Sequence, residues 1–325
     1  MKYKSCHLIE HGIFFSLKEI WLCCYLPNEK SEVVKFVDPY DGGAIDWGKI
    51  ADFREKIRMG LKKGQIPVTC EGCFNLEEKE WDESNKISNI YLAHWSHCNC
   101  DCTYCYFPDK NYYNNFKPYK ALPILEEMKE KDIFRNDGYV AISGGEPAIL
   151  DELDGIIDFL LVNDIRSIVV NSSGVKYSES IARGISTGKL DLTISLDCGD
   201  AELYKKIKQI DSFDTVVENI KIYAASQQIS QENVRVKYII IPGINDTKEN
   251  IDKWIQVVLS AKVRKIILDL ESSWFLNNRN NIQKHIYDLI QYVENQASEL
   301  NLKIDYYSHA DQLRLEKTAN RRLDN

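Results

Sequence analysis

Three cysteines, Cys98, Cys102 and Cys105, lie close enough in the chain to bind one metal centre together. Three thiolates from one loop can bind three irons of a cubane iron-sulfur cluster, which leaves the fourth iron open for an exogenous ligand. The segment also suits a zinc loop in which Cys98 or Cys100 pairs with Cys102 and Cys105, with His94 or His97 as a further ligand. In the iron-sulfur interpretation, Cys100 is a bystander.

A second candidate motif, Gly144-Gly145-Glu146, stands at the end of a predicted strand further along the chain. Glycines allow a backbone to approach a ligand closely, and the carboxylate of Glu146 can accept hydrogen bonds from an ammonium group. Alone, this segment would predict an ordinary turn. Together with the cysteine loop, it indicates a ligand site.

Both motifs resemble those of the radical S-adenosylmethionine (radical SAM) superfamily. Cys98, Cys102, Tyr104 and Cys105 match its pattern of Cys, three residues, Cys, one residue, an aromatic residue and Cys, and Gly144-Gly145-Glu146 matches its Gly-Gly-Glu motif. The resemblance implies a 4Fe-4S cluster whose open iron chelates the methionine part of S-adenosylmethionine. An electron from the cluster then cleaves the sulfonium to give a 5'-deoxyadenosyl radical, while Glu146 binds the methionine ammonium.

The resemblance extends more weakly to the later strands. Asn171 and Ser173 end the third predicted strand and are placed to contact polar atoms of the cofactor. Ser195 and Asp197 resemble positions that bind the ribose hydroxyls or the carboxylate, and the segment containing Ile241 resembles the strand and turn on the adenine side. Each of these residues could instead merely cap a strand end.

Five further cysteines precede the loop, and four of them could form one site: Cys6, one of Cys23 or Cys24, Cys70 and Cys73. Their spacing suits zinc or a second 4Fe-4S cluster equally. The segment resembles the auxiliary-cluster modules called SPASM or twitch domains, although those usually follow the barrel and this one precedes it. The resemblance implies a cluster that accepts an electron from the substrate radical.

The elements that position these residues alternate from about residue 88 onward, as in repeated βα units around a parallel sheet. We therefore predict an α/β fold, a partial (β/α)6 TIM-like barrel with a small N-terminal cysteine-rich metal-binding domain. The predicted domains are 1–83, 84–310 and a tail at 311–325, with the charged segment 77–86 as linker. The predicted strands are Ile90–Trp95, Tyr139–Ser143, Ser167–Asn171, Leu192–Leu196, Val234–Ile241, Lys265–Leu270 and Lys303–Tyr307. The predicted helices are Tyr119–Lys131, Ile149–Val162, Glu179–Ser186, Phe213–Ala225, Lys248–Ser260 and Ile282–Leu300.

Composition narrows the classes of partner. The formal net charge of -8 disfavours nucleic acid, whose phosphates select basic surfaces. The sequence has no apolar run long enough for a membrane span and no signal-peptide pattern at its start, so we expect a cytoplasmic protein. In a reducing cytoplasm, ten clustered cysteines indicate metal ligands rather than disulfides.

The predicted function is hydrogen abstraction from a peptide, sugar or aminocyclitol, with the auxiliary cluster as redox partner and a flavodoxin or ferredoxin as electron donor. A second hypothesis is radical epimerisation with Cys198 as hydrogen donor, because this residue directly follows the fourth predicted strand. A buried inert cysteine is the simpler reading of Cys198. A zinc-stabilised binding module without catalysis is the alternative from another class.

Overall fold

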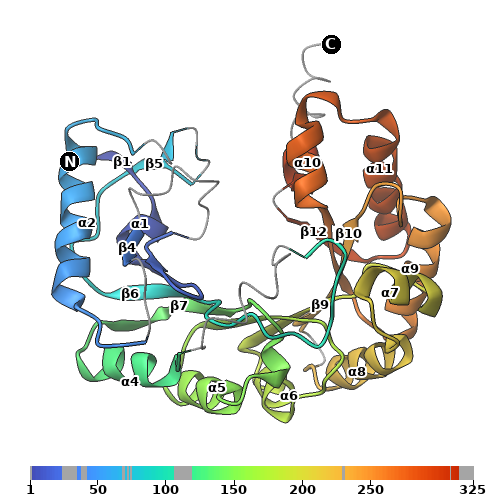
Figure 1. Cartoon of the computed structure of the whole chain (residues 1–325), viewed down its shortest axis with the longest axis horizontal. Coiled ribbons are helices and arrows are strands. Elements are labelled where there is room, and N and C mark those ends of the chain that lie inside the picture. The colour runs from blue at the N-terminus through green and yellow to red at the C-terminus, as the bar shows by residue number, and fades with distance from the viewer. Residues whose placement is uncertain are drawn as a thin grey trace. The chain divides into compact units, whose positions relative to one another are not determined.

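The computed structural model describes residues 2–23, 35–37, 42–67, 70–71, 73, 75–105, 119–228, 231–307 and 309–314, with only the backbone of 35–37 and of residue 280. The chain divides into two compact units (Figure 1). The first unit contains residues 1–97 and 109–169, and the second contains 98–108 and 170–325. The cysteine loop therefore belongs to the second unit, although its neighbours in the sequence belong to the first.

The first unit is built on parallel strands. Strand β6 pairs in parallel with β7 on one side and with β2 on the other, and β3 and β4 extend this sheet antiparallel beyond β2. Strands β1 and β5 form a separate antiparallel pair. The elements are β1 (Tyr3–Ser5), α1 (His7–His11), β2 (Gly12–Phe15), β3 (Ile20–Trp21), β4 (Lys35–Val37), α2 (Trp47–Lys62), β5 (Glu77–Lys79), β6 (Ile87–Leu92), α4 (Leu122–Glu130), β7 (Phe134–Ile142), η3 (Pro147–Ile149) and α5 (Leu153–Val162).

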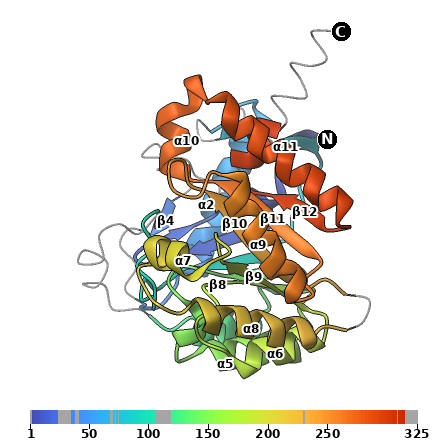
Figure 2. The ribbon, with the colours of Figure 1, turned by 90° about the vertical axis from the view of Figure 1, so that its right-hand side faces the viewer.

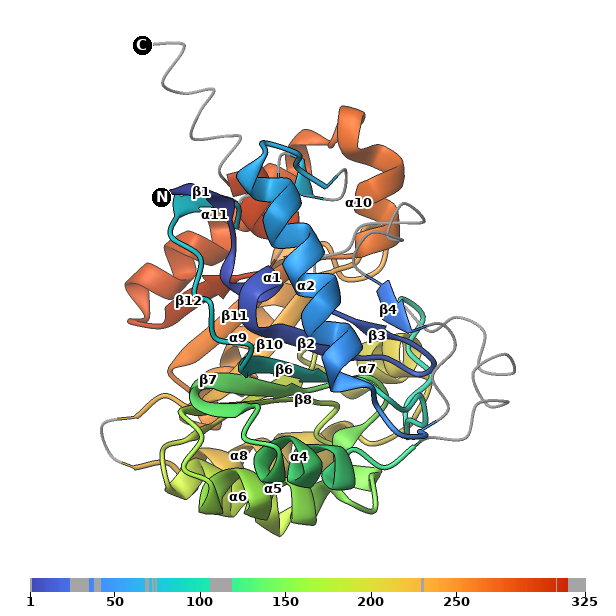
Figure 3. The same cartoon turned by 90° about the vertical axis from the view of Figure 1, so that its left-hand side faces the viewer.

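Helices cover both faces of this sheet. Helices α4 and α5 lie on one side of β6 and β7, and α1 and α2 lie on the other (Figure 3). Central strand residues such as Ile13, Ile90 and Val140 are fully buried between these layers. A parallel sheet covered on both faces requires apolar strands of this kind.

Strand β2 lies in the predicted N-terminal domain, but it pairs with β6 of the predicted barrel domain, on the other side of the predicted boundary between 83 and 84. Ile13 stands beside Ile90 in the parallel pairing of β2 with β6, so the N-terminal segment extends the sheet of the βα units. With only four residues, β2 is too short for its periodicity to be recognised in the sequence. The N-terminal cysteine-rich domain is not confirmed, and the predicted boundaries stay predictions.

The second unit continues the βα pattern. Strands β9, β10, β11 and β12 pair in parallel in that order, and helices α8, α9 and α11 cover one face of them (Figure 2). Strand β8 (Ser167–Ser172) begins in the first unit and ends in the second. The further elements are α6 (Glu179–Ser186), β9 (Leu190–Ser195), α7 (Ala201–Lys208), α8 (Phe213–Ala225), β10 (Val234–Ile240), α9 (Lys248–Ser260), β11 (Lys265–Leu270), α10 (Ser272–Asn278), η4 (Arg279–Asn281), α11 (Lys284–Glu299) and β12 (Lys303–Tyr306).

Alternation along β10 separates the core of the second unit from its polar face. Val236 and Tyr238 are buried, and the Tyr238 ring lies 5.0 Å from the ring of Trp254 on α9. Lys237 points to the opposite face, because successive strand residues face opposite sides of a sheet. The face away from the helices therefore carries the polar side chains.

Every predicted strand and helix overlaps an observed element. Helices α1, α2, α7 and α10 were not predicted. Throughout the described ranges, no helix has the length and apolar character that a membrane span requires. The predicted tail from residue 315 onward lies outside the described residues.

Candidate functional site

The four cysteines of the cysteine loop, residues 98–105, differ in their exposure to solvent. Cys98 is exposed, Cys102 and Cys105 are half-buried, and Cys100 is buried. None of the nine cysteines in the described part of the chain is in a disulfide. Within that part, no three side chains of His, Cys, Asp or Glu are gathered as a complete metal site.

The electrostatics of the loop favour a thiolate at Cys102. A hydrogen bond from Cys100 and the positive charge of Lys208 outweigh burial and lower the pKa of the Cys102 thiol to about 6. The same contacts with Cys102 and Cys98, with burial, raise the pKa of Cys100. Metal ligands must be thiolates, so Cys102 fits a cluster ligand and Cys100 fits a protonated bystander.

The end of helix α7 supports the backbone of the loop. The N–H of Asp101 donates to the carbonyl of Lys208 at 3.0 Å, and the N–H of Thr103 donates to that of Ile207 at 2.9 Å. Carbonyls at the end of a helix have no partner within the helix, so they are available to such donors. Asp200, which caps α7 by accepting from the Leu203 N–H, was the unused sequence signal for this helix.

Three side chains, which we call the Lys208 network, lie beside this backbone contact: Tyr104, Asp197 and Lys208. The Lys208 ammonium is 2.7 Å from the Tyr104 hydroxyl and 2.5 Å from Asp197 Oδ2, and the Tyr104 hydroxyl also donates to Asp197. Burial alone would lower the pKa of Lys208, but Asp197 and Tyr104 raise it well above its usual value. Burial and the Asp197 charge likewise raise the pKa of Tyr104. Lys208 is therefore a buried, charged ammonium.

The predicted cofactor residues of β8 and β9 lie in the second unit with the loop. Ser173 Oγ donates to Asn99 Oδ1 of the loop at 3.0 Å. Asn171 Oδ1 is buried and accepts no hydrogen bond from any described group, which leaves an acceptor for a ligand at this strand end. Ser195 ends β9 half-buried. The thiolate chemistry of the loop and this free acceptor fit a bound cluster with S-adenosylmethionine.

Asp197 and Ile241 are occupied by internal contacts. Asp197 is fully buried, and its Oδ1 accepts from the Ile239 N–H at 2.8 Å. The N–H of Ile241 donates to Asn245 Oδ1 at 2.7 Å, and Asn245 Nδ2 donates to the carbonyl of Asp197 at 2.9 Å. These contacts hold Asp197 in place within the second unit, and its predicted contact with the ribose hydroxyls or the carboxylate of the cofactor stays a prediction.

The Gly-Gly-Glu motif lies in the first unit, against the chain that leads into the cysteine loop. The N–H of Glu146 donates to the carbonyl of His97 at 2.8 Å, and Cys98 is the next residue. A Cβ on Gly145 would stand 2.0 Å from this carbonyl oxygen, and Gly144 adopts a φ of 111°. These glycines therefore allow close approach of two backbone segments, whereas the sequence suggested approach to a ligand. Glu146 is buried, and its Oε1 accepts from the Ala148 N–H at 2.9 Å.

Cys198, the predicted hydrogen donor of the epimerase hypothesis, is fully buried. Its Sγ donates to the carbonyls of Leu196 at 3.5 Å and Asp200 at 3.7 Å. Burial raises the pKa of this thiol far above its usual value. The contacts are those of an inert packed cysteine, and the epimerase hypothesis gains no support from them.

Three of the N-terminal cysteines are neighbours in the first unit. Burial, more than the charges of Cys70 and Cys73 nearby, raises the pKa of Cys6 to about 11. The Cys6 sulfur accepts from the N–H of Ile9 at 3.4 Å. Cys23 is half-buried, and Cys24 lies outside the described residues.

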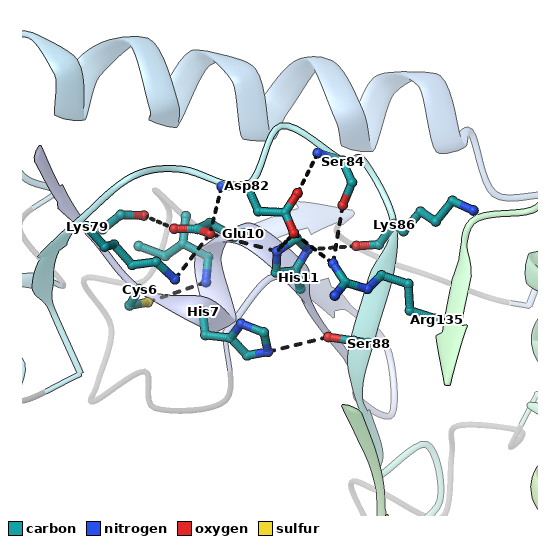
Figure 4. A network of polar contacts seen from close by, with 12 residues as sticks. Cys6, His7, Glu10, His11, Lys79, Asp82, Ser84, Lys86, Ser88 and Arg135 are labelled. Atoms are coloured by element: carbon teal, nitrogen blue, oxygen red, sulfur yellow. Dashed lines mark hydrogen bonds and ion pairs between the residues drawn. The ribbon is translucent and has the colours of Figure 1, made fainter. Parts of the chain in front are cut away.

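Next to Cys6, a group of charged side chains joins α1 to residues 79–82 and to β7 (Figure 4). We call this group the Glu10 network; its members are Ser5, Glu10, His11, Lys79, Asp82 and Arg135. The Glu10 carboxylate is fully buried, lies 3.3 Å from the Lys79 ammonium and accepts from Ser5 Oγ at 2.7 Å and from the Asp82 N–H at 3.2 Å. The network thus fastens the predicted linker segment to the sheet.

Sequence comparisons match the part of the chain that carries these motifs. The profile of the Radical SAM superfamily matches residues 92–256. A GTP 3',8-cyclase of Pasteurella multocida (strain Pm70) is 24% identical over 160 residues, which cover 47% of this chain and 45% of that protein. GTP 3',8-cyclase 1 of Mycobacterium tuberculosis (strain ATCC 25618 / H37Rv) is 29% identical over 148 residues, 43% of this chain and 40% of that protein. The chain thus spans less than half the length of these curated relatives.

Solved structures show the same fold. SuiB of Streptococcus suis, bound to its precursor peptide SuiA, superposes with a TM-score of 0.52 at 13% identity and covers 95% of this chain and 73% of its own. Native anSMEcpe with bound AdoMet superposes with a TM-score of 0.52 at 14% identity, and the match covers 66% of this chain and 62% of that chain. These likenesses confirm the α/β partial barrel. Because the superfamily profile covers half of the chain and includes both motifs, the protein belongs to the radical SAM superfamily and is an enzyme that uses a 4Fe-4S cluster and S-adenosylmethionine.

Proposed function

We propose that this enzyme abstracts a hydrogen atom from a peptide or, as second choice, from a sugar-like substrate. The observation that carries the radical chemistry is the cysteine loop, which lies in the same unit as the buried acceptor Asn171 Oδ1 and contains a Cys102 thiol of lowered pKa. The peptide alternative is supported by the likeness to SuiB bound to a precursor peptide, which extends over 95% of this chain. The GTP 3',8-cyclase of Pasteurella multocida matches this chain over only 45% of its own length, which gives less support to GTP as the substrate.

In this proposal, Cys98, Cys102 and Cys105 hold the cluster, which when bound supplies the electron that cleaves the sulfonium of S-adenosylmethionine. Asn171 Oδ1 accepts a hydrogen bond from a donor group of the cofactor. Ser173 orients the loop through its bond to Asn99.

We propose that a flavodoxin or ferredoxin reduces the cluster. We further propose that Cys6, Cys70 and Cys73 bind an auxiliary 4Fe-4S cluster, with Cys23 or Cys24 as fourth ligand. Neighbouring thiols support a shared metal, because a metal displaces their protons and lets several thiolates lie together. Zinc is the alternative occupant.

Iron analysis and product analysis test the two parts separately. Protein reconstituted anaerobically should contain about eight irons per chain with two clusters and about four with one. Cys73→Ser should remove only the second set, and Cys198→Ala, as a matched control, should keep both. A colourless N-terminal site that contains zinc would contradict the auxiliary cluster and leave the radical chemistry intact.

Reduction of the iron-loaded protein with S-adenosylmethionine should release 5'-deoxyadenosine. Deuterated peptides and deuterated sugars, supplied in separate incubations, then identify the substrate class by deuterium transfer into 5'-deoxyadenosine. Transfer from peptides supports the first choice and transfer from sugars the second. Failure of the iron-loaded enzyme to form 5'-deoxyadenosine would overturn the proposed reaction.

A further inference from the structure

The Lys208 network ties the cysteine loop to the barrel through a side chain that no sequence motif marks. Lys208 and Asp197 are both buried, with 2% and 0% of their side chains exposed. Tyr104, their third member, stands between two cluster cysteines, Cys102 and Cys105. A shift of the Lys208 ammonium would therefore move Tyr104 and, with it, the adjacent cysteines Cys102 and Cys105.

The backbone contact and the side-chain contact act on the same residue of α7. The carbonyl of Lys208 accepts from Asp101, one residue before Cys102, and its ammonium contacts Tyr104, two residues after Cys102. Lys208 thus holds the loop on both sides of this cysteine. Such partners behind the ligands orient them, and their loss typically weakens metal binding by about 10- to 100-fold.

Asp197 anchors the Lys208 network to the sheet. Its Oδ1 accepts from the Ile239 N–H on β10, its carbonyl accepts from Asn245, and its backbone has a φ of 64°. The carboxylate therefore cannot follow the loop if the loop moves. Asp197 therefore holds the Lys208 ammonium in position against Tyr104 of the cysteine loop.

We propose that Lys208 is a positioning residue for the cluster loop and that its ammonium raises the reduction potential of the cluster bound there. Reduction adds negative charge to the cluster. A cation held nearby, away from water, stabilises that added charge, and charge near a cluster is one of the factors that set its potential. The inference rests on the cluster that superfamily membership implies and is independent of the substrate.

The test compares three variants of the iron-loaded protein: Lys208→Gln, Lys208→Arg and Lys205→Gln. Lys205 is the matched control, since it lies on the same helix, is exposed and pairs with Asp211 on the surface. Two quantities are measured: the midpoint potential, by redox titration followed by electron paramagnetic resonance, and the rate at which an iron chelator removes the cluster.

Lys208→Gln should shift the potential to more negative values and speed loss of iron by about tenfold. Lys208→Arg should keep the potential close to that of the wild type, because it keeps the charge, while iron loss is still faster. Lys205→Gln should match the wild type in both measurements. An unchanged potential and unchanged iron loss in Lys208→Gln would overturn the proposal.

Lys208→Gln leaves Asp197 without its cation and can fail to fold. In that case Tyr104→Phe decides the positioning role, because it removes one hydroxyl and leaves the buried ion pair in place. Faster loss of iron from Tyr104→Phe, with Lys208→Arg retaining the potential, supports the proposal. Iron loss at the wild-type rate in Tyr104→Phe overturns it. Formation of 5'-deoxyadenosine is followed in parallel, so that failure of the proposed reaction is recognised separately.

Discussion

The Lys208 network and the Glu10 network both bury a charged group, but they serve different parts of the protein. In the first, the ammonium of Lys208 contacts Tyr104, which lies between two cluster cysteines. In the second, Glu10 contacts Lys79 and the backbone of Asp82, and none of the members is a predicted ligand. Cys6 lies beside the Glu10 network, yet the hydrogen bond of its sulfur goes to α1. The buried charge of Lys208 therefore points to the cluster site because it contacts the cysteine loop, whereas the buried charge of Glu10 stabilises the fold.

The largest effect should come from the cysteine loop. Cys102→Ala should abolish binding of the cluster, because a cubane held by three thiolates loses one of its ligands. The reconstituted variant should lack the iron of the loop and form no 5'-deoxyadenosine. Cys100→Ala is the control and should keep both the iron and the formation of 5'-deoxyadenosine, since hydrogen bonds with Cys102 and Cys98, with burial, raise the pKa of Cys100 and disfavour its thiolate. Equal loss of iron in both variants would mean that Cys100 is a ligand.

Glu10→Ala should weaken the fold and leave the cluster alone. Removing one partner of a buried ion pair costs about 3–5 kcal/mol, and the lower end applies because Lys79 is one-quarter exposed. Urea unfolding measures the loss, and iron content per folded chain should stay at the wild-type value. Glu10→Gln keeps a side-chain oxygen that can accept hydrogen bonds, so it should lose less stability than Glu10→Ala. Loss of cluster iron in folded Glu10→Ala would remove the distinction between the two networks.

Gly145→Ala should disturb the entry to the cysteine loop from the first unit. Its Cβ would stand 2.0 Å from the His97 carbonyl oxygen, so one of the two backbone segments must move. Overpacking of this kind costs about 1–3 kcal/mol. Since Cys98 follows His97, faster loss of iron to a chelator should accompany the lower stability. Gly60→Ala is the control, because a Cβ there meets nothing closer than 3.7 Å.

The sequence predicted the repeated βα units well because strong periodicity marks each of them, from β6 to β12. The two superfamily motifs, which lie within the matched profile, could be recognised because they are short and local. The Lys208 network could not be predicted, because it forms between residues 104, 197 and 208 through tertiary packing. Strand β2 was missed since its pairing with β6 depends on contacts far along the chain. The predicted cofactor role of Asp197 stays a prediction, whereas its complete burial and its ion pair with Lys208 arise from tertiary packing and could not be predicted.

The smallest effect should appear in acid, at the exposed edge of the Glu10 network. Hydrogen bonds from Ser84 and Arg135 lower the pKa of Asp82 to about 2. A carboxyl whose pKa is lower in the folded state stabilises the protein fully above its unfolded pKa, about 3.9, and this contribution disappears as the pH falls toward 2. Asp82→Asn should therefore be less stable than the wild type at neutral pH and approach it below pH 4, as measured by thermal unfolding against pH. The Asp82 side chain is 44% exposed, so solvent screening keeps the difference small. A constant difference across the whole pH range would show that Asp82 acts through packing rather than through its charge.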